Sequence, residues 1–197
     1  MTDTPLTIER ILVAAEDVVR RHGPDKATVS DVARALGVSH AAVHKYVGTK
    51  SELRDLVVNR WMEVMMPELR VIAAEGRAQA PRRLRRLIDE LIAFKRSRSK
   101  EDPQLFAAYR TLALGAHDAV AVHINELISL IAAVIRSGID EGTMRKQDPL
   151  TAARAVLLAT SRFHHPLHAD EWSDPKIDAA FNDVWRLLMY GLVIGDR

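Results

Sequence analysis

The fold is decided by residues 28–53, which read TVSDVARALGVSHAAVHKYVGTKSEL. Thr28 and Asp31 have the spacing of a capping box in its acidic form, which predicts that a short helix begins there. Gly37 is suited to end that helix, and Ser39 is suited to cap a second one. Two short helices joined by a turn that contains glycine have the dimensions of a helix-turn-helix. The stretch therefore predicts this motif, with the first helix packed and the second presented to a partner.

The second short helix is expected over residues 40–46, and its N-terminal residues would meet base edges in the major groove. Small apolar side chains allow the two helices to pack closely. A further capping box, from Thr49 to Glu52, opens a longer helix that runs past Trp61. The edge left for DNA is short and consists of His40, Ala41, Ala42, His44 and Lys45.

Residues 7–55 resemble the DNA-binding region of the tetracycline-repressor (TetR) family. The capped start, the Gly-Val-Ser turn, the Lys before the fourth helix and the Leu after it recur at the spacing of that family. The resemblance implies a recognition helix over residues 39–46, a Thr28 that caps and touches phosphate, and a Lys50 that holds a DNA phosphate. The expected DNA-binding residues are Thr28, Ser39, His40, Ala41, Ala42, His44, Lys45, Tyr46 and Lys50.

The stretch also departs from the family pattern. His44 stands where a phosphate-contacting tyrosine is common, Val47 replaces the usual phenylalanine, and Ala41 replaces a frequent glycine. We expect these changes to alter the contact pattern and the base preference, because His44 can still donate to a phosphate and Val47 can still fill the core.

Composition limits the class of protein. The chain has 197 residues, of which 48% are hydrophobic and 5% aromatic, with no cysteine and a net charge of +2. Disulfides, thiolate catalysis and cysteine metal sites are therefore excluded. The N-terminus lacks the pattern of a secretory signal, and no apolar run approaches the ~18 residues of a membrane span. We expect a cytoplasmic protein without a membrane partner.

The pattern predicts an all-α chain in which Thr4-Pro5 or Thr7 starts the first helix and His22-Gly23-Pro24 stops it. A three-helix helix-turn-helix domain is expected over residues 1–52, and a larger helical ligand-binding and dimerisation domain over residues 53–197. Later helices are expected near 82–99, 103–114, 117–141, 149–164 and 175–194. The resemblance implies a homodimer that pairs the helices near 149–164 and 175–194.

The resemblance also implies a repressor that a small-molecule effector releases from a palindromic operator with half-sites about 34–36 Å apart. Few charges among the candidates favour an apolar or mixed-polarity effector. Phe94 and Phe106 fit an ordinary core better than a pocket wall. The candidate pocket residues are Phe94, Phe106, Tyr109, Arg110, His117, His123 and Phe163.

Large apolar residues near the C-terminus are typical of a dimer surface, with packing inside the chain as the alternative. These residues are Trp172, Phe181, Val184, Trp185, Leu188 and Leu192. His164 and His168 have a usable metal-ligand spacing beside His165, but Pro166 interrupts the helix between them. We therefore expect no metal and no cofactor, and place the histidines at a pocket wall or an interface.

Residues 77–100 hold nine lysines and arginines but two acidic residues, a net charge of +7. A solvated helix face is the preferred interpretation, and an anionic neighbour is the alternative. An enzyme is disfavoured, because the chain has no Gly-rich phosphate loop, Gly-x-Ser-x-Gly elbow or Glu-x-x-His pair, and no catalytic residue is expected. A helical interaction protein with a vestigial DNA-binding head is the other alternative.

Overall fold

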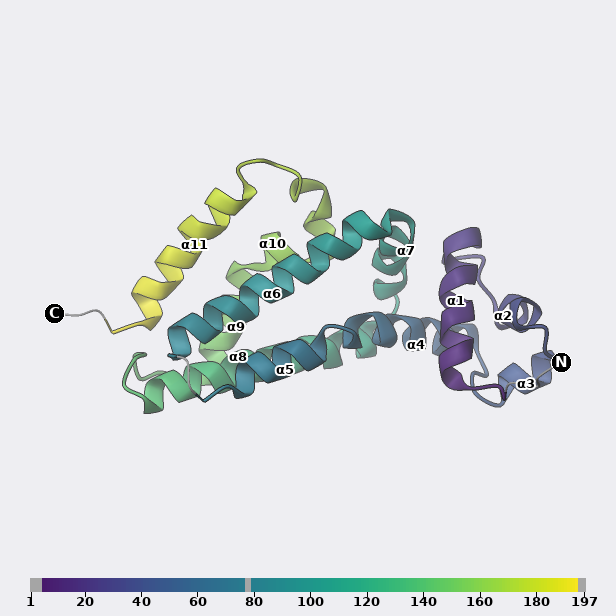
Figure 1. The fold of residues 1–197 in the computed structure, drawn as a ribbon, viewed down its shortest axis with the longest axis horizontal. Helices are drawn as coiled ribbons and strands as arrows, with labels where there is room; N and C mark the ends of the chain where they lie inside the picture. The colour runs from purple at the N-terminus through teal and green to yellow at the C-terminus, as the bar shows by residue number, and fades with distance from the viewer. Residues whose placement is uncertain (1–4, 77–78, 195–197) are drawn as a thin grey trace. The chain divides into compact units, whose positions relative to one another are not determined.

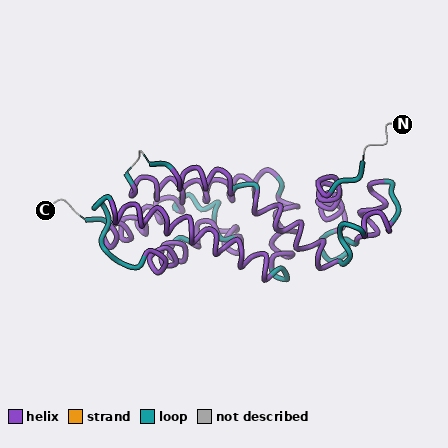
Figure 2. Tube along the Cα trace, turned by 90° about the horizontal axis from the view of Figure 1, so that it is seen from below, coloured by secondary structure: helices purple, strands orange, loops and turns teal. Residues whose placement is uncertain are grey.

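A computed structural model describes residues 5–76 and 79–194, and every regular element in this part of the chain is helical (Figures 1 and 2). The predicted all-α class is confirmed. The helices are α1 (Ile8–His22), α2 (Val29–Leu36), α3 (His40–His44), α4 (Lys50–Glu63), α5 (Met66–Ala74), α6 (Ala80–Glu101), α7 (Pro103–Ala113), α8 (His117–Asp140), α9 (Pro149–Ala159), α10 (Ser161–His164), the 3-10 helix η1 (Pro166–Glu171) and α11 (Ile177–Leu192).

The described chain forms two compact units. Unit 1 contains residues 5–64 and 102–123, and unit 2 contains residues 65–76, 79–101 and 124–194. The predicted boundary at residue 52 separates DNA binding from ligand binding and dimerisation. The two compact units describe packing alone, so this boundary stays a prediction.

Unit 1 begins with a small core formed by helices α1 to α4. Helix α1 packs against α2 and α4, and α2 packs against α3 (Figure 1). Thr7 caps α1 by accepting a hydrogen bond from Arg10 N at 3.2 Å, which selects it over the alternative start at Thr4-Pro5. Short side chains contribute to its centre, where Ala15, Val32 and Val43 are fully buried together with the longer Ile11. Short side chains let these helices approach one another closely.

Helix α7 completes unit 1, although it lies 40 residues further along the chain than α4. Asp102 caps α7 by accepting from Leu105 N at 2.9 Å, and it also accepts from Arg20 Nε of α1 at 2.9 Å. Trp61 of α4 stacks on Tyr109 of α7 with ring centroids 3.7 Å apart. Unit 1 is thus a helix-turn-helix head built onto one helix from the middle of the chain.

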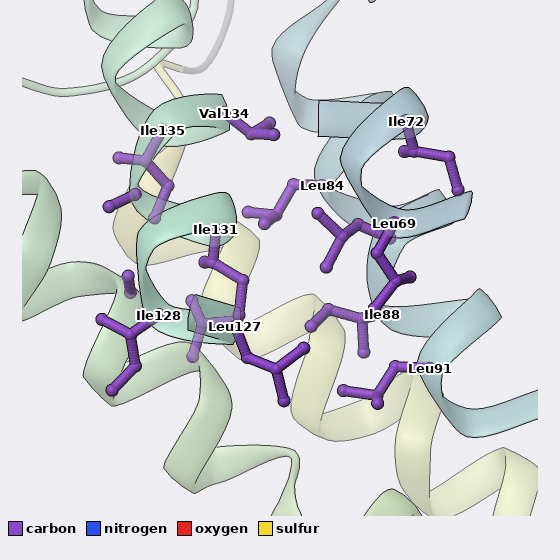
Figure 3. Close-up of a cluster of buried hydrophobic side chains, with 14 of the residues drawn as sticks. Leu69, Ile72, Leu84, Ile88, Leu91, Leu127, Ile128, Ile131, Val134 and Ile135 are labelled. Atoms are coloured by element: carbon purple, nitrogen blue, oxygen red, sulfur yellow. The ribbon is translucent and has the colours of Figure 1, made fainter. Parts of the chain in front are cut away.

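Unit 2 is held by a core of leucine and isoleucine. Figure 3 shows side chains of α5 and α6 facing those of α8, among them Leu84, Leu91 and Ile131, which are fully buried. Their spacing of three, four or seven residues along each helix is that of an apolar stripe. Phe163 and Phe181 close this core from α10 and α11.

Helix α8 is long and apolar enough to cross a membrane by length and composition. Its fully buried residues Ile131, Val134 and Ile135 lie in the core of unit 2. The apolarity of α8 is accordingly that of a central core helix.

Three helix predictions are corrected. The helix expected over residues 149–164 is broken at Thr160, whose Oγ1 donates to Val156 O at 2.8 Å. A threonine hydroxyl that bonds the preceding turn competes with the helical ladder. The second helix of the motif ends at His44 rather than Tyr46. Helix α5, which has Pro67 in its first turn, was missed because its apolar residues continue the stripe of α4.

Candidate nucleic-acid interface

The capping box at the start of α2 is confirmed. Thr28 Oγ1 accepts from Asp31 N at 3.2 Å, and the Asp31 carboxylate accepts from Thr28 N at 3.2 Å. The Thr28 hydroxyl also donates to Asp31 Oδ2 at 2.6 Å, and this bond, with the nearby Arg34, lowers the pKa of Asp31. The hydroxyl proton of Thr28 is thus engaged in the cap, and its contact with phosphate stays a prediction.

The turn between α2 and α3 depends on Gly37, which has a φ of +68°. A side chain in this left-handed region is strained, whereas glycine is not. Val38 N donates to Ala33 O at 3.1 Å, which satisfies a carbonyl at the end of α2. Gly37 therefore fixes the direction in which the chain leaves α2. Val38 and Ser39, the N-cap of α3, complete the turn.

Helix α3 presents the predicted edge. Ser39 Oγ caps it by accepting from Ala42 N at 3.2 Å, and Val43 is fully buried beneath it. His40, Ala41 and His44 are exposed. The imidazole rings of His40 and His44 lie on one side of the helix, with centroids 5.6 Å apart. This is a short exposed edge of small and hydrogen-bonding side chains, of the kind that enters a major groove.

Of the residues that follow α3, some are exposed and others support the fold. Lys45 is exposed, while Val47 is fully buried. The Tyr46 hydroxyl donates to Leu6 O at 2.8 Å, so it ties the segment before α1 to the end of α3. A second role for Tyr46 at DNA stays a prediction.

Lys50 lies in the first turn of α4. Thr49 Oγ1 accepts from Glu52 N at 3.1 Å, as the sequence predicts, but Glu52 Oε2 accepts from Gly48 N at 2.7 Å rather than from Thr49. Lys50 is exposed, and its Nζ donates to the main-chain carbonyl of Asp25. An ammonium group has three donors, so this bond leaves it the capacity to hold a phosphate.

The predicted effector residues are divided between the two units. In unit 1, Phe106 and Tyr109 are buried against Trp61, and burial raises the pKa of Tyr109. In the same unit Arg110 is half-buried, His117 exposed and His123 buried. These aromatic side chains therefore act as core for unit 1, while their proposed contact with an effector is untested.

In unit 2, Phe94 is half-buried and Phe163 fully buried. The Phe163 ring meets Phe181 edge-on, with centroids 5.1 Å apart. Phe163 is thus part of the same core as Leu91 and Ile131.

The dimer surface predicted from large C-terminal residues is corrected. Phe181, Trp185 and Leu192 are buried in the core of unit 2 within a single chain, and Val184 and Leu188 pack against it. Trp172 is also buried, and its Nε1 donates to Arg162 O at 3.0 Å. The alternative of packing inside the chain holds for the four buried residues, while a place for the half-buried Val184 and Leu188 in a dimer surface stays a prediction.

The histidines at the end of α10 are partnered within the protein. His164 is buried, with Nε2 3.3 Å from Thr160 Oγ1, and burial together with the nearby Lys95 lowers its pKa to about 3. His168 Nδ1 lies 2.8 Å from Glu171 Oε1, and His165 Nδ1 accepts from Leu167 N. Among the described residues no group of three or more His, Asp or Glu side chains is placed to hold a metal ion.

The basic stretch is a solvated face only in part, because Arg82, Arg86 and Lys100 are exposed whereas two of its members are buried. Arg83 and Lys95 are 2% and 4% exposed, and burial lowers the pKa of Lys95 to about 7. Arg85, Arg86 and Arg96 form ion pairs with carboxylates of the same unit. Arg77 lies outside the described residues. The burial of Lys95 could have been predicted from spacing, because position 95 is four residues after Leu91 and lies on the same buried face of the helix.

Comparisons with known proteins agree with this geometry. A sequence profile described as "Bacterial regulatory proteins, tetR family" matches residues 11–57, and one described as "Tetracyclin repressor-like, C-terminal domain" matches residues 80–185. No curated protein sequence matches the chain.

Solved structures share the fold. SmeT, the repressor of the Stenotrophomonas maltophilia multidrug efflux pump SmeDEF, is 23% identical with a TM-score of 0.72, over 98% of this chain and 93% of SmeT. A SmeT–triclosan complex matches at 22% identity and a TM-score of 0.70, over 94% and 91% of the two chains. A TetR transcription regulator from Haloarcula marismortui is 25% identical with a TM-score of 0.71, over 93% and 97%.

Proposed function

Because this chain belongs to the tetracycline-repressor family of DNA-binding regulators, we propose that it is a cytoplasmic homodimeric repressor that a small-molecule effector releases from a palindromic operator. The observation that carries the proposal is the capped α2–turn–α3 motif with its exposed edge beside Lys50. A plain three-helix bundle has no need of a glycine-fixed turn that leaves such an edge uncovered.

The edge of α3 suits direct reading of bases. The methyl groups of Ala41 and Ala42 fit beside the methyl group of thymine, and the imidazoles of His40 and His44 can hydrogen-bond base edges or phosphates. Lys50 holds the backbone as a positive point charge, which positions the head without reading sequence. One α3 edge contacts few base pairs and so gives little sequence specificity. Recognition of an operator is therefore favoured by a dimer with two recognition helices.

Dimerisation is proposed through a second copy of α9 and α11. Among the large apolar side chains left for that surface, Leu158, Leu187 and Tyr190 are the most exposed, at 75%, 72% and 72%. Large apolar side chains that remain this exposed on a chain of this family suit a homodimer interface. Sedimentation should give a dimer for the natural chain and a monomer for Leu187→Asp.

The effector is proposed to bind in the C-terminal domain and to be apolar or of mixed polarity. Unit 2 combines an apolar core that includes Phe163 with the buried polar side chains Lys95 and His164, which suits a ligand of mixed polarity. The SmeT complex with triclosan provides a precedent for a small organic ligand in a protein of the same fold.

The proposal is tested by selecting genomic fragments with the purified protein at near-physiological salt. A palindrome with half-sites about one helical turn, 34–36 Å, apart is expected. Lys50→Ala should weaken operator binding about tenfold and reduce the salt slope by about 2, since each head of the dimer loses one phosphate contact, whereas Lys146→Ala, an exposed lysine of unit 2, should leave both unchanged. Binding without sequence preference, or equal binding by both variants, would contradict the proposal.

A further inference from the structure

Unit 1 contains a cleft of about 390 Å³ beside the first two turns of α4. Its walls come from the end of α1, the loop before α2, α4, and the end of α7 as far as Gly115. Clefts and cavities that hold organic ligands typically measure about 300–1,000 Å³. The cleft is separate from the candidate effector residues, none of which lines it.

The floor of the cleft is apolar. Val19, Leu53, Val57 and Leu112 line it, and all four are buried. They come from α1, α4 and α7, so the floor forms only where α7 packs on the head. A flat hydrocarbon body would gain contact with all three helices at once.

The rim of the cleft carries two cations. Lys50 and Arg54 are four residues apart on α4, which places them on one side of the helix. The Arg54 side chain is 29% exposed, its Nη2 donates to Ser51 Oγ at 2.8 Å, and its Nε donates to Asp55 Oδ1 at 3.0 Å in an ion pair. A Cβ at Gly115 would lie 2.8 Å from Arg54 Nη1, so the absence of a side chain at Gly115 leaves room for the guanidinium. Arg54 is thereby held against the end of α7, at the edge of the apolar floor.

Apolar walls under two cations define the chemistry of a ligand. Arg54 Nε and Nη2 are engaged with Asp55 and Ser51, which leaves Nη1 to donate to a carboxylate, and Lys50 can add a second charge-assisted hydrogen bond. Asp25 also lines the cleft and disfavours a ligand of high negative charge. A compact aromatic monocarboxylate meets both conditions.

We propose that this cleft binds a compact aromatic monocarboxylate, with its ring on the apolar floor and its carboxylate on Arg54 and Lys50, and that the bound anion weakens operator binding. The second half rests on the proposed function, since Lys50 is the residue that holds a DNA phosphate there. A carboxylate and a phosphate held by the same Lys50 ammonium group repel each other, so the anion acts on the DNA-binding head directly.

The binding half is tested without DNA, by calorimetric titration of the full chain with 2-naphthoate and with its neutral analogue 2-naphthamide. One 2-naphthoate per chain is expected, and the amide should bind at least about fivefold more weakly. Arg54→Gln should weaken 2-naphthoate binding about fivefold. Arg21→Gln removes the same charge from an arginine of unit 1 outside the cleft and should change nothing.

Thr111→Trp should abolish binding, because Thr111 is an exposed residue at the cleft and tryptophan would fill it. Thermal melting checks that this variant folds, and Arg54→Gln tests the same site if it does not. Equal binding of acid and amide, no saturation, or full binding by a folded Thr111→Trp would overturn the proposal.

The competition half is tested with the selected operator. At a 2-naphthoate concentration ten times its dissociation constant, operator affinity should fall about tenfold. Unchanged operator affinity with the cleft occupied would overturn this half. A chain that binds no operator in any condition would instead contradict the proposed function, while the titration without DNA would still decide whether the cleft binds the anion.

Discussion

Between residues 28 and 53, threonine and serine side chains cap three successive helices, whereas in unit 2 leucine and isoleucine from α5, α6 and α8 meet across long stretches of sequence. Capping acts within one turn of the chain, and core packing acts between helices that any loop could connect. The contrast indicates that the head owes its precision to local hydrogen bonds and glycine geometry. Unit 2 owes its stability to the apolar surface that it buries, and the charged side chains of Arg83 and Lys95 are buried in the same unit.

The largest expected effect lies in the core of unit 2. Ile131→Ala should lower the free energy of unfolding by about 2–5 kcal/mol, because Ile131 is fully buried among other large side chains and the cavity would not close. Urea unfolding followed by circular dichroism measures the change. Ile124→Ala in the same helix, at an exposed position, should cost far less, and an equal cost would place the stabilising contacts elsewhere.

A buried charge gives the next effect. The pKa of Lys95 is about 7 in the folded chain, below its usual 10.5, so above pH 7 the unfolded chain binds more protons than the folded one. The free energy of unfolding should therefore rise from pH 7 towards pH 10. Lys95→Met should remove that rise and raise stability at pH 6 by about 1–3 kcal/mol. A pH profile parallel to that of the natural chain would show that Lys95 is not the group responsible.

Glycine substitutions should have opposite signs in the two units. Gly37→Ala should destabilise by about 1–2 kcal/mol, because φ is +68° and strain arises although nothing lies within 4 Å of the added carbon. Gly191→Ala, inside α11 and also open, should stabilise by about 0.5–1 kcal/mol. The pair is compared by thermal melting, and a loss at both positions would mean that packing rather than backbone geometry decides.

The smallest effect tests the cap. Thr28→Ala should cost about 1 kcal/mol, since it removes both hydrogen bonds of the hydroxyl with Asp31. Ser30→Ala, at an exposed position two residues further along in the first turn of α2, serves as the control. Hydrogen exchange of the amides of α2 should accelerate in the first variant alone; unchanged exchange would mean that the cap adds nothing to the motif.

The same contrast explains which predictions held. The starts of α2, α3 and α4 were predictable, because Thr28, Ser39 and Thr49 each act on an amide three residues away. The break at Thr160 was not, since threonine occurs inside many helices and only its local conformation shows the interruption. The assignment of Trp185 to a dimer surface was wrong for a related reason. An apolar stripe predicts that a helix face is buried, but it does not show whether the partner is the same chain or a second copy.

By itself the sequence determined the all-α class, the helix-turn-helix with its exposed edge, and Lys50 at the start of α4, because caps, glycine turns and apolar spacing are set by neighbours along the chain. Only the tertiary structure decided that α7 joins the head, that Arg83 and Lys95 are buried, and that Val19, Arg54 and Leu112 share one cleft. These features depend on which helices, distant in the sequence, pack against one another. That packing is stabilised by many weak contacts between segments, and no single segment contains them.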